Sequence, residues 1–200
     1  MDNRITRPIP SDREVDWIRT KVLLSKTDTK GTILYANEAF IDVSGYDEHE
    51  LIGHAHNIVR HPDMPKVIFK FLWDSIKSSQ NIHVIIKNMS KTGRYYWVVT
   101  DFKIIADGDG EIVGYFGTRK AVPDEIITKF IEPLYKKLLH IEEASGMGAA
   151  EDYLIGFLEE RKKTYTEYVD HLIATGKDDK NKISKGLFSG LFEKKSAPKK

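Results

Sequence analysis

HNIVRHPDMP, residues 56–65, divides the predicted fold into two halves. Its two prolines interrupt the backbone hydrogen bonding, so a regular helix cannot begin until Asp63 is in place to cap one. The sequence before this stretch predicts two strands and two short helices, and the sequence after it predicts a longer helix and three strands. This order predicts an α+β domain built on an antiparallel sheet.

The first half is expected to begin with a hairpin. Residues 22–36 (VLLSKTDTKGTILYA) contain two β-rich runs separated by a Thr-Lys-Gly turn. Asn37 is a typical N-cap for a short helix that Gly45 ends, and Asp47 with Glu50 predicts a second short helix. Two short helices in succession leave the backbone irregular, as the wall of a cavity requires.

The second half is expected to contain a helix over residues 66–77, with apolar residues on more than one side, and then three strands. From Pro123 the apolar spacing changes from two to between three and four, which predicts helices. Ser145–Gly148 interrupts them, and the second helix follows a heptad pattern with one charged member, Arg161. The predicted strands of this half are residues 83–89, 95–105 and 111–120.

Composition limits the classes of protein that fit. At 200 residues, with 40% hydrophobic and 30% charged residues, the chain is expected to be one water-soluble domain with appended helices. No apolar run approaches the roughly 18 residues of a bilayer helix, and the first residues lack a secretory signal, so we expect a cytoplasmic protein. Without cysteine there is no disulfide, thiolate metal site or thioether-linked flavin, so redox sensing would need a bound cofactor.

Charge is unevenly distributed. Residues 177–200 carry eight lysines and three acids, which leaves the rest of the chain at a net −4 and unlike a nucleic-acid binder. Within this tail, residues 186–192 (GLFSGLF) either belong to a flexible segment or make peripheral contact with an anionic membrane or a partner groove.

The quoted stretch closely resembles the PAS domain of bacterial aerotaxis receptors. The resemblance covers about half the chain, and the long HNIVRHPDMP string is more specific than an isolated Asn-x-x-Phe or Gly-Tyr. It implies a PAS fold, a five-stranded antiparallel sheet with short helices on one face, followed by an α-helical hairpin. The other matching segments are residues 25–28 (SKTD), 33–37 (ILYAN), 43–46 (VSGY), 50–53 (ELIG), 87–88 (KN) and 96–98 (YWV).

The resemblance also implies a function. PAS domains of this family bind FAD noncovalently and report redox state to a chemotaxis signalling domain. This sequence shows neither the membrane anchor nor the signalling hairpin of one-piece receptors, so it resembles the cytoplasmic PAS half of a split energy-taxis receptor. The implied partner is a membrane-bound methyl-accepting-type transducer on a separate chain, which would hold the protein at the inner face of the membrane. A homodimer is a further option.

The implied division is an N-terminal extension (1–21), a PAS sensor domain (22–122), a helical hairpin (123–175) and a flexible Lys-rich tail (176–200).

A flavin needs apolar walls, amides for its polar ring edge, and cations or backbone N–H groups for its diphosphate. Asn37 and Asn88 are candidates for the ring edge, although Asn37 also has the position of a helix cap. Arg60 and His61 precede a helix N-terminus, which favours a diphosphate, but Arg60 could instead pair with Asp63.

The remaining candidates are His56, for the cofactor or a backbone carbonyl, and two tryptophans that are equally at home in a core. The candidate cofactor-binding residues are therefore Asn37, His56, Arg60, His61, Asp63, Trp73, Asn88 and Trp97. Asp63 is expected to act mainly as a helix cap that fixes the loop, and Trp73 is the better candidate of the two tryptophans. The sequence departs from its relatives at Ile82, near a position where related sensors often carry tryptophan.

Two other functions stay open. One of the seven histidines could hold haem, and a cofactor-free adaptor would fill its pocket with side chains. We find no nucleophile–base–acid set, phosphate-cradling glycine loop or metal motif, so we predict neither an enzyme nor a metal site.

Overall fold

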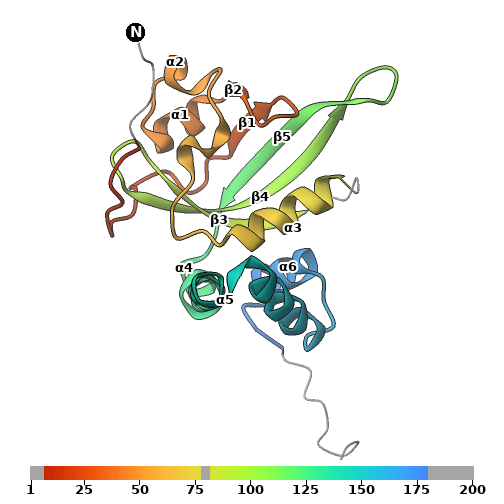
Figure 1. Ribbon diagram of the computed structural model, residues 1–200. Coiled ribbons are helices and arrows are strands. Elements are labelled where there is room, and N and C mark those ends of the chain that lie inside the picture. Colours follow the sequence, from red (N-terminus) through yellow and green to blue (C-terminus); the bar gives the residue numbers. More distant parts are fainter. Residues whose placement is uncertain (1–6, 78–81, 180–200) are drawn as a thin grey trace, which may run out of the picture.

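The computed structural model describes residues 7–77 and 82–179. Its centre is a five-stranded antiparallel sheet in the order β2-β1-β5-β4-β3 (Figure 1). The first strand therefore lies beside the last, so the two halves of the sequence meet in one sheet. The predicted strands are confirmed to within two residues at each end. Their bounds are β1 Leu23–Thr27, β2 Ile33–Ala36, β3 His83–Met89, β4 Tyr95–Ala106 and β5 Ile112–Ala121.

Pairing between β1 and β5 gathers polar groups on one face of the sheet. Ser25 lies opposite Gly117, and Leu23 lies opposite Arg119. Because alternate side chains of a strand share a face, Ser25, Thr27 and Arg119 point to the same side of the sheet. That side is the one covered by the short helices.

The short helices form where the sequence predicts them. They are α1 (Glu38–Ser44), α2 (Glu48–Leu51), the 3₁₀ turn η1 (His56–Val59) and α3 (Lys66–Lys77). The side chain of Asn37 accepts a hydrogen bond from the Phe40 N–H at 3.0 Å, and Gly45 ends α1 in a left-handed conformation with φ 68°. Phe40 and Leu51 are buried, and they anchor α1 and α2 against the sheet.

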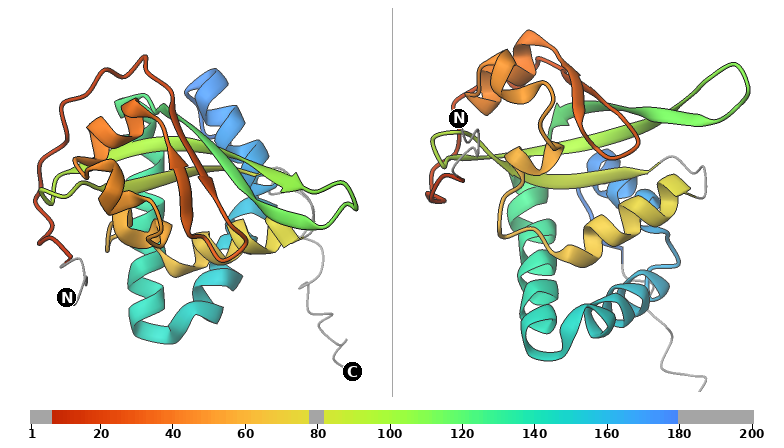
Figure 2. Two further views of the ribbon diagram at one scale, coloured as in Figure 1. Left: turned by 90° about the horizontal axis from the view of Figure 1, so that it is seen from above. Right: turned by 45° about the horizontal axis from the view of Figure 1, so that its top comes forward.

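The C-terminal region is helical, but it is not the predicted two-helix hairpin. It contains α4 (Asp124–Ile126), a π-helical turn η2 (Ile127–Ile131), α5 (Glu132–Glu159) and α6 (Tyr165–Thr175). The predicted interruption is confirmed, since Gly146 has φ 86° and ψ 172° and bends α5 into two arms (Figure 2).

The prediction of a single helix after this interruption, however, is wrong. The second arm of α5 ends at Glu159, and α6 starts after Thr164. Lys162 adopts a left-handed φ of 51°, and Thr164 forms a capping box with Glu167, whose carboxylate accepts the Thr164 N–H at 2.7 Å. These local hydrogen bonds override the heptad spacing that runs across the break.

The C-terminal helices cover the edge strand β3. The Tyr135 hydroxyl donates to the Ile85 carbonyl at 2.6 Å and bonds the Tyr165 hydroxyl at 2.5 Å. The Thr166 hydroxyl accepts the His83 N–H at 3.3 Å. An uncovered strand edge is a template for pairing with another chain, so α5 and α6 protect this one.

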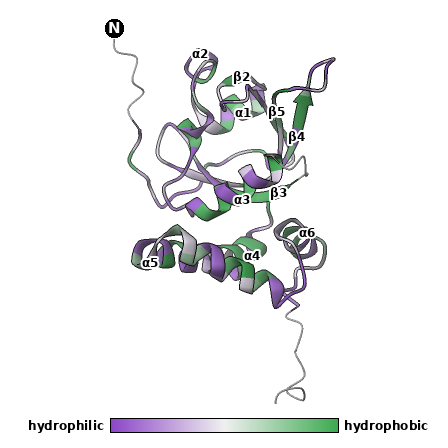
Figure 3. Ribbon diagram, turned by 45° about the vertical axis from the view of Figure 1, so that its right-hand side comes forward, coloured by the Kyte–Doolittle hydropathy of each residue, from purple (hydrophilic) through white to green (hydrophobic). Residues whose placement is uncertain are grey.

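Figure 3 shows hydrophilic and hydrophobic residues alternating along α5. Among the helices of residues 7–77 and 82–179, none combines the length and the apolar character that crossing a bilayer demands. The predicted tail segment 186–192 lies outside the described residues.

Candidate cofactor site

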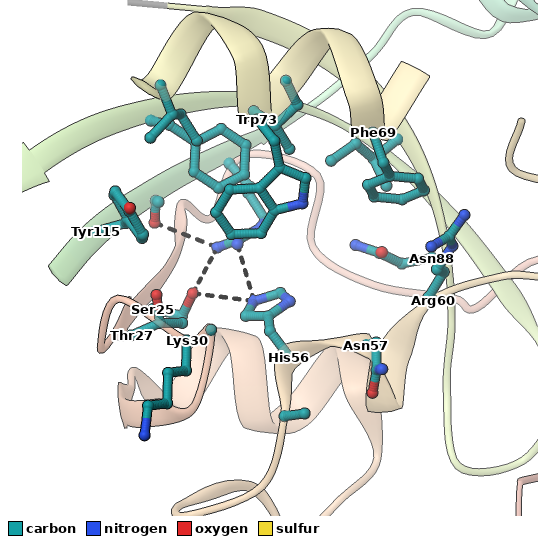
Figure 4. A pocket seen from close by; sticks show the side chains of 18 residues that line it. Ser25, Thr27, Lys30, His56, Asn57, Arg60, Phe69, Trp73, Asn88 and Tyr115 are labelled. Carbon is teal, nitrogen blue, oxygen red and sulfur yellow. Dashed lines mark hydrogen bonds between the residues drawn. The ribbon is translucent and has the colours of Figure 1, made fainter. Parts of the chain in front are cut away.

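A cavity of about 270 Å³ lies between α3 and the sheet (Figure 4). Its upper wall in Figure 4 is α3, which contributes Phe69 and Trp73. Trp73 is 38% exposed and meets Tyr115 of β5 edge-on, with ring centroids 5.7 Å apart, so these two rings border the opening. The other large apolar residues of the lining are Leu72, Ile76, Ile86 and Phe102.

A buried arginine lies on the sheet side of the cavity. Arg119 is 1% exposed, and its guanidinium donates to the Ser25 hydroxyl at 2.9 Å and to the Gly117 carbonyl at 3.3 Å. Its second terminal nitrogen lies 2.9 Å from His56 Nε2, and its Nε has no hydrogen-bond partner. Gly117 leaves room for it, because a Cβ there would lie 2.8 Å from the guanidinium.

No carboxylate of the described residues forms an ion pair with Arg119. Burial lowers the pKa of Arg119 to about 10, so the side chain stays charged at neutral pH. A buried charge without a counter-ion is costly to the fold. The cavity therefore contains an uncompensated positive charge.

His56 completes this cluster as a neutral imidazole. Burial, together with the charge of Arg119, lowers the pKa of His56 to about 3. Its Nε2 also lies 3.2 Å from the Ser25 hydroxyl. Since Arg119 can only donate, His56 Nε2 is the acceptor and the ring proton belongs on Nδ1.

Acidification is expected to destabilise the protein through His56 and His61, whose pKa values are lowered to about 3 and about 4. Unfolded histidine takes up a proton near pH 6.5, so below that pH the unfolded state binds more protons and the free energy of unfolding falls, by up to about 1.4 kcal/mol per pH unit for each histidine. Urea unfolding at about pH 7 and about pH 5 should show a smaller loss in His56→Gln than in the wild type. The exposed His49→Gln is the control, and an unchanged loss in His56→Gln would contradict the assignment.

The whole lining is positively charged. Of the 18 described residues that line the cavity, three are cationic and none is acidic. The Arg60 guanidinium lies 3.8 Å from the centre of the Phe69 ring, and exposed Lys30 lies at the rim. The Asn88 Nδ2 is buried without a hydrogen-bond partner. This arrangement of donors and cations around apolar walls suits a flat, acceptor-rich, anionic ligand.

Four of the eight predicted site residues line this cavity, namely His56, Arg60, Trp73 and Asn88. Asn37 does not, because both the oxygen and the nitrogen of its amide are hydrogen-bonded to the backbone. Its oxygen accepts the N–H groups of Leu24 (2.9 Å) and Phe40, and its nitrogen donates to the Val22 carbonyl at 2.9 Å. Its role in the structure is that of a cap and strand tie.

The other three, His61, Asp63 and Trp97, gather outside the cavity around Lys87. The Lys87 ammonium donates to the Asp63 carboxylate at 2.8 Å and lies 5.9 Å from the Trp97 ring. His61 is 3% exposed, and its Nδ1 accepts the Asp63 N–H at 3.1 Å. Asp63 and Trp97 line a second hollow, of about 340 Å³, against α5.

Two expectations about this loop are wrong. Asp63 pairs with Lys87, not with Arg60, whose guanidinium stacks on Phe69. Asp63 also does not cap α3, since the carboxylate of Glu142 from α5 accepts the first N–H groups of that helix. The helix N-terminus predicted to receive a diphosphate is therefore already occupied by an anion of the protein.

Sequence reasoning missed Arg119 and Ser25. The available signal was alternation: Tyr115, Gly117 and Arg119 share one face of β5, and a glycine two residues before an inward-facing arginine leaves space for its head group. Ile82, which departs from the relatives, is 2% exposed in the core and does not line the cavity.

The geometry of the cavity bears on the two functions that the sequence leaves open, a haem sensor and a cofactor-free adaptor. Among the described residues that line the cavity, His56 is the one histidine, and its Nε2 is already hydrogen-bonded, so an axial bond to haem would require it to leave Arg119. The described residues include no cluster of three or more metal-ligating side chains. The cavity is also not filled by the side chains around it, contrary to what a cofactor-free adaptor requires.

Comparison with known proteins agrees with this geometry. A family model described as the PAS fold matches residues 33–119. The chain is 43% identical to the aerotaxis receptor of Escherichia coli (strain K12) over 116 residues, 58% of this chain. The chain therefore contains a stretch that matches the PAS fold, and it is similar to an aerotaxis receptor over 58% of its length. The bacterioopsin transcriptional activator of Halobacterium salinarum is 27% identical over 100 residues, half of this chain.

Its PAS domain also resembles solved structures. The light-state structure of the blue-light photoreceptor Aureochrome1 LOV superposes with a TM-score of 0.51 at 19% identity, covering 56% of this chain and 89% of that one. At this identity the likeness concerns the fold alone. The aligned stretch is 22% of the aerotaxis receptor and 15% of the transcriptional activator, so this chain spans only a small part of the length of these relatives.

Proposed function

We propose that the protein is a redox or energy sensor whose PAS domain binds FAD noncovalently and signals to a separate chemotaxis transducer. The observation that carries the proposal is the uncompensated Arg119 in a cavity whose described lining residues include no acid. Such a charge is costly in the empty protein, and an electron-rich ligand edge would offset that cost. The family implies the same cofactor.

The cavity residues fit a flavin in three groups. Phe69, Trp73 and Tyr115 offer aromatic surface to the ring system. Arg119 and the unpartnered Asn88 Nδ2 offer donors to its polar edge. Lys30 and Arg60, at and near the rim, offer positive charge to a phosphate-bearing tail that leaves the cavity. A volume of about 270 Å³ suits the ring rather than the whole dinucleotide.

A bound flavin supplies reversible electron acceptance, and its reduction changes the hydrogen bonding that its ring demands. The chain itself holds the ring, sets its electrostatic surroundings through Arg119, and responds at Asn88. Asn88 lies on β3, whose outer edge is bonded to α5 and α6. The protein would thus act as a sensor rather than as an enzyme.

The transducer is the second part of the proposal. Its support is the 43% identity to an aerotaxis receptor over 116 residues, together with the helices that cover the β3 edge. A membrane-bound methyl-accepting-type transducer should copurify with a tagged form of this chain from detergent-solubilised membranes of the source cells. Failure to recover one would remove this part and leave the cofactor part standing.

The cofactor is tested by reconstitution. Purified protein is incubated with FAD, FMN or riboflavin, passed through gel filtration, and examined for flavin absorbance. We expect FAD to be retained in stoichiometric amount and riboflavin to be retained least, because riboflavin lacks the phosphates that Lys30 and Arg60 would contact. A colourless protein in all three experiments would refute the flavin proposal, and a haem spectrum in protein as purified would replace it.

A further inference from the structure

One residue of helix α5, Glu142, caps the N-terminus of helix α3. The Glu142 carboxylate accepts the Lys66 N–H at 3.1 Å and the Val67 N–H at 2.8 Å. The first N–H groups of a helix have no partner within it, and a carboxylate there also interacts favourably with the helix dipole. The cap of α3 therefore comes from a different helix, 75 residues further along the chain.

A second contact joins the same two helices beyond the bend. The Lys70 ammonium of α3 lies 2.6 Å from Glu151 and 2.8 Å from Asp74. Gly146, where α5 bends, falls between Glu142 and Glu151, so each arm of α5 contributes one carboxylate to α3. Figure 2 shows α3 lying across the angle between the two arms.

The helix held in this way is the aromatic wall of the cavity. Phe69 and Trp73 follow the Glu142-capped end by one and two turns. Glu142 also acts on Arg60, whose pKa is lowered by burial and by Arg7 and is partly restored by the charge of Glu142. A displacement of Glu142 therefore changes both the position of the aromatic wall and the electrostatic surroundings of Arg60.

We propose that Glu142 and Glu151 are positioning residues of the cavity, through which the bent helix α5 and the cavity ligand influence one another. This coupling is reciprocal. If the contact between α5 and α3 raises the affinity of the cavity for its ligand, then ligand binding must stabilise that contact by the same free energy. The inference rests on the proposed flavin site for its ligand, but the contact between α3 and α5 can be measured without any ligand.

The test compares Glu142→Ala with Glu142→Gln, which keeps an acceptor oxygen, and with Glu143→Ala, which removes the exposed neighbouring charge. A cap is worth about 1 kcal/mol, so we expect Glu142→Ala to weaken FAD binding about five-fold. Glu142→Gln should recover most of the affinity, and Glu143→Ala should bind FAD as the wild type does. Glu151→Gln should weaken binding less than Glu142→Ala, because the Lys70 contact is half-exposed.

Hydrogen exchange supplies the second readout. In the wild type, FAD should slow exchange in α3 and also in residues 142–151, and Glu142→Ala should remove the effect on α5. Wild-type affinity and wild-type exchange in Glu142→Ala would overturn the proposal. If the wild type binds no FAD, the proposed function fails, yet faster exchange of α3 in ligand-free Glu142→Ala would still support the contact and unchanged exchange would refute it. If Glu142→Ala does not fold, the comparison is made between Glu151→Gln, which should bind FAD more weakly than the wild type, and Glu143→Ala, which should not.

Discussion

Replacing Arg119 with methionine is expected to stabilise the ligand-free protein while weakening its binding of FAD. Arg119 is 1% exposed and has no acidic partner among the described residues. An apolar side chain of similar length removes the cost of burying that charge, so we expect a gain of about 1–4 kcal/mol in the free energy of unfolding. It also removes charge-assisted hydrogen bonds to the ligand, worth about 1.5–3 kcal/mol, so FAD affinity should fall by about 10- to 100-fold.

Urea unfolding without ligand and equilibrium titration with FAD measure the two effects separately. The matched control is Lys120→Met, because Lys120 is the next residue on β5 and is exposed on the opposite face of the strand. It removes the same charge and should change neither quantity appreciably. A less stable Arg119→Met protein that binds FAD normally would show that Arg119 is structural.

The fold could be predicted almost completely from the sequence because its determinants are local. The Asn37 cap, the Gly45 end of α1 and the turns between strands depend on residues a few positions apart. The C-terminal region shows the limit of such patterns. Apolar spacing predicts one helix across Arg161, yet Lys162 and the Thr164 capping box end it there.

The site could be predicted only in part, because it depends on contacts between distant segments. The cap of α3 is Glu142, and no local pattern distinguishes this glutamate from its neighbours. Sequence alone also cannot tell whether the amide of Asn37 faces a ligand or the backbone, and here three backbone hydrogen bonds hold it against the backbone.

The HNIVRHPDMP string, residues 56–65, contributes side chains to two separate places in the structure. Arg60 lines the cavity, whereas His61 and Asp63 lie with Lys87 behind it, where Asp63 and Lys87 line the hollow against α5. A continuous string of characteristic residues therefore does not mark one binding surface. In this protein the string connects the cavity to the helix that would respond to it, which is consistent with the proposed role of α5.

Replacing Arg161 with methionine is expected to cause the largest loss of stability in the C-terminal region, about 3 kcal/mol. Its side chain is 2% exposed, and it forms two hydrogen bonds to Asp178, each 2.7 Å long. It also donates to the Phe157 carbonyl at 2.8 Å and lies 3.5 Å from the centre of the Phe157 ring. Removing one partner of a buried pair leaves the other charge uncompensated, which typically costs 3–5 kcal/mol. The partial exposure of Asp178 places this case at the lower end.

The double variant Arg161→Met, Asp178→Asn separates the two contributions. It also replaces the Asp178 carboxylate, which Arg161→Met alone leaves without its partner. Its free energy of unfolding should therefore be about 1 kcal/mol or more higher than that of Arg161→Met. Because the pair ties the segment after α6 to the end of α5, its loss should also loosen α6, whose Thr166 bonds the β3 edge and whose Tyr165 bonds the Tyr135 hydroxyl. We therefore expect Arg161→Met to self-associate at concentrations where the wild type does not, as measured by light scattering. A destabilised variant with unchanged association would mean that α5 alone is sufficient to protect the edge, since its Tyr135 still bonds Ile85.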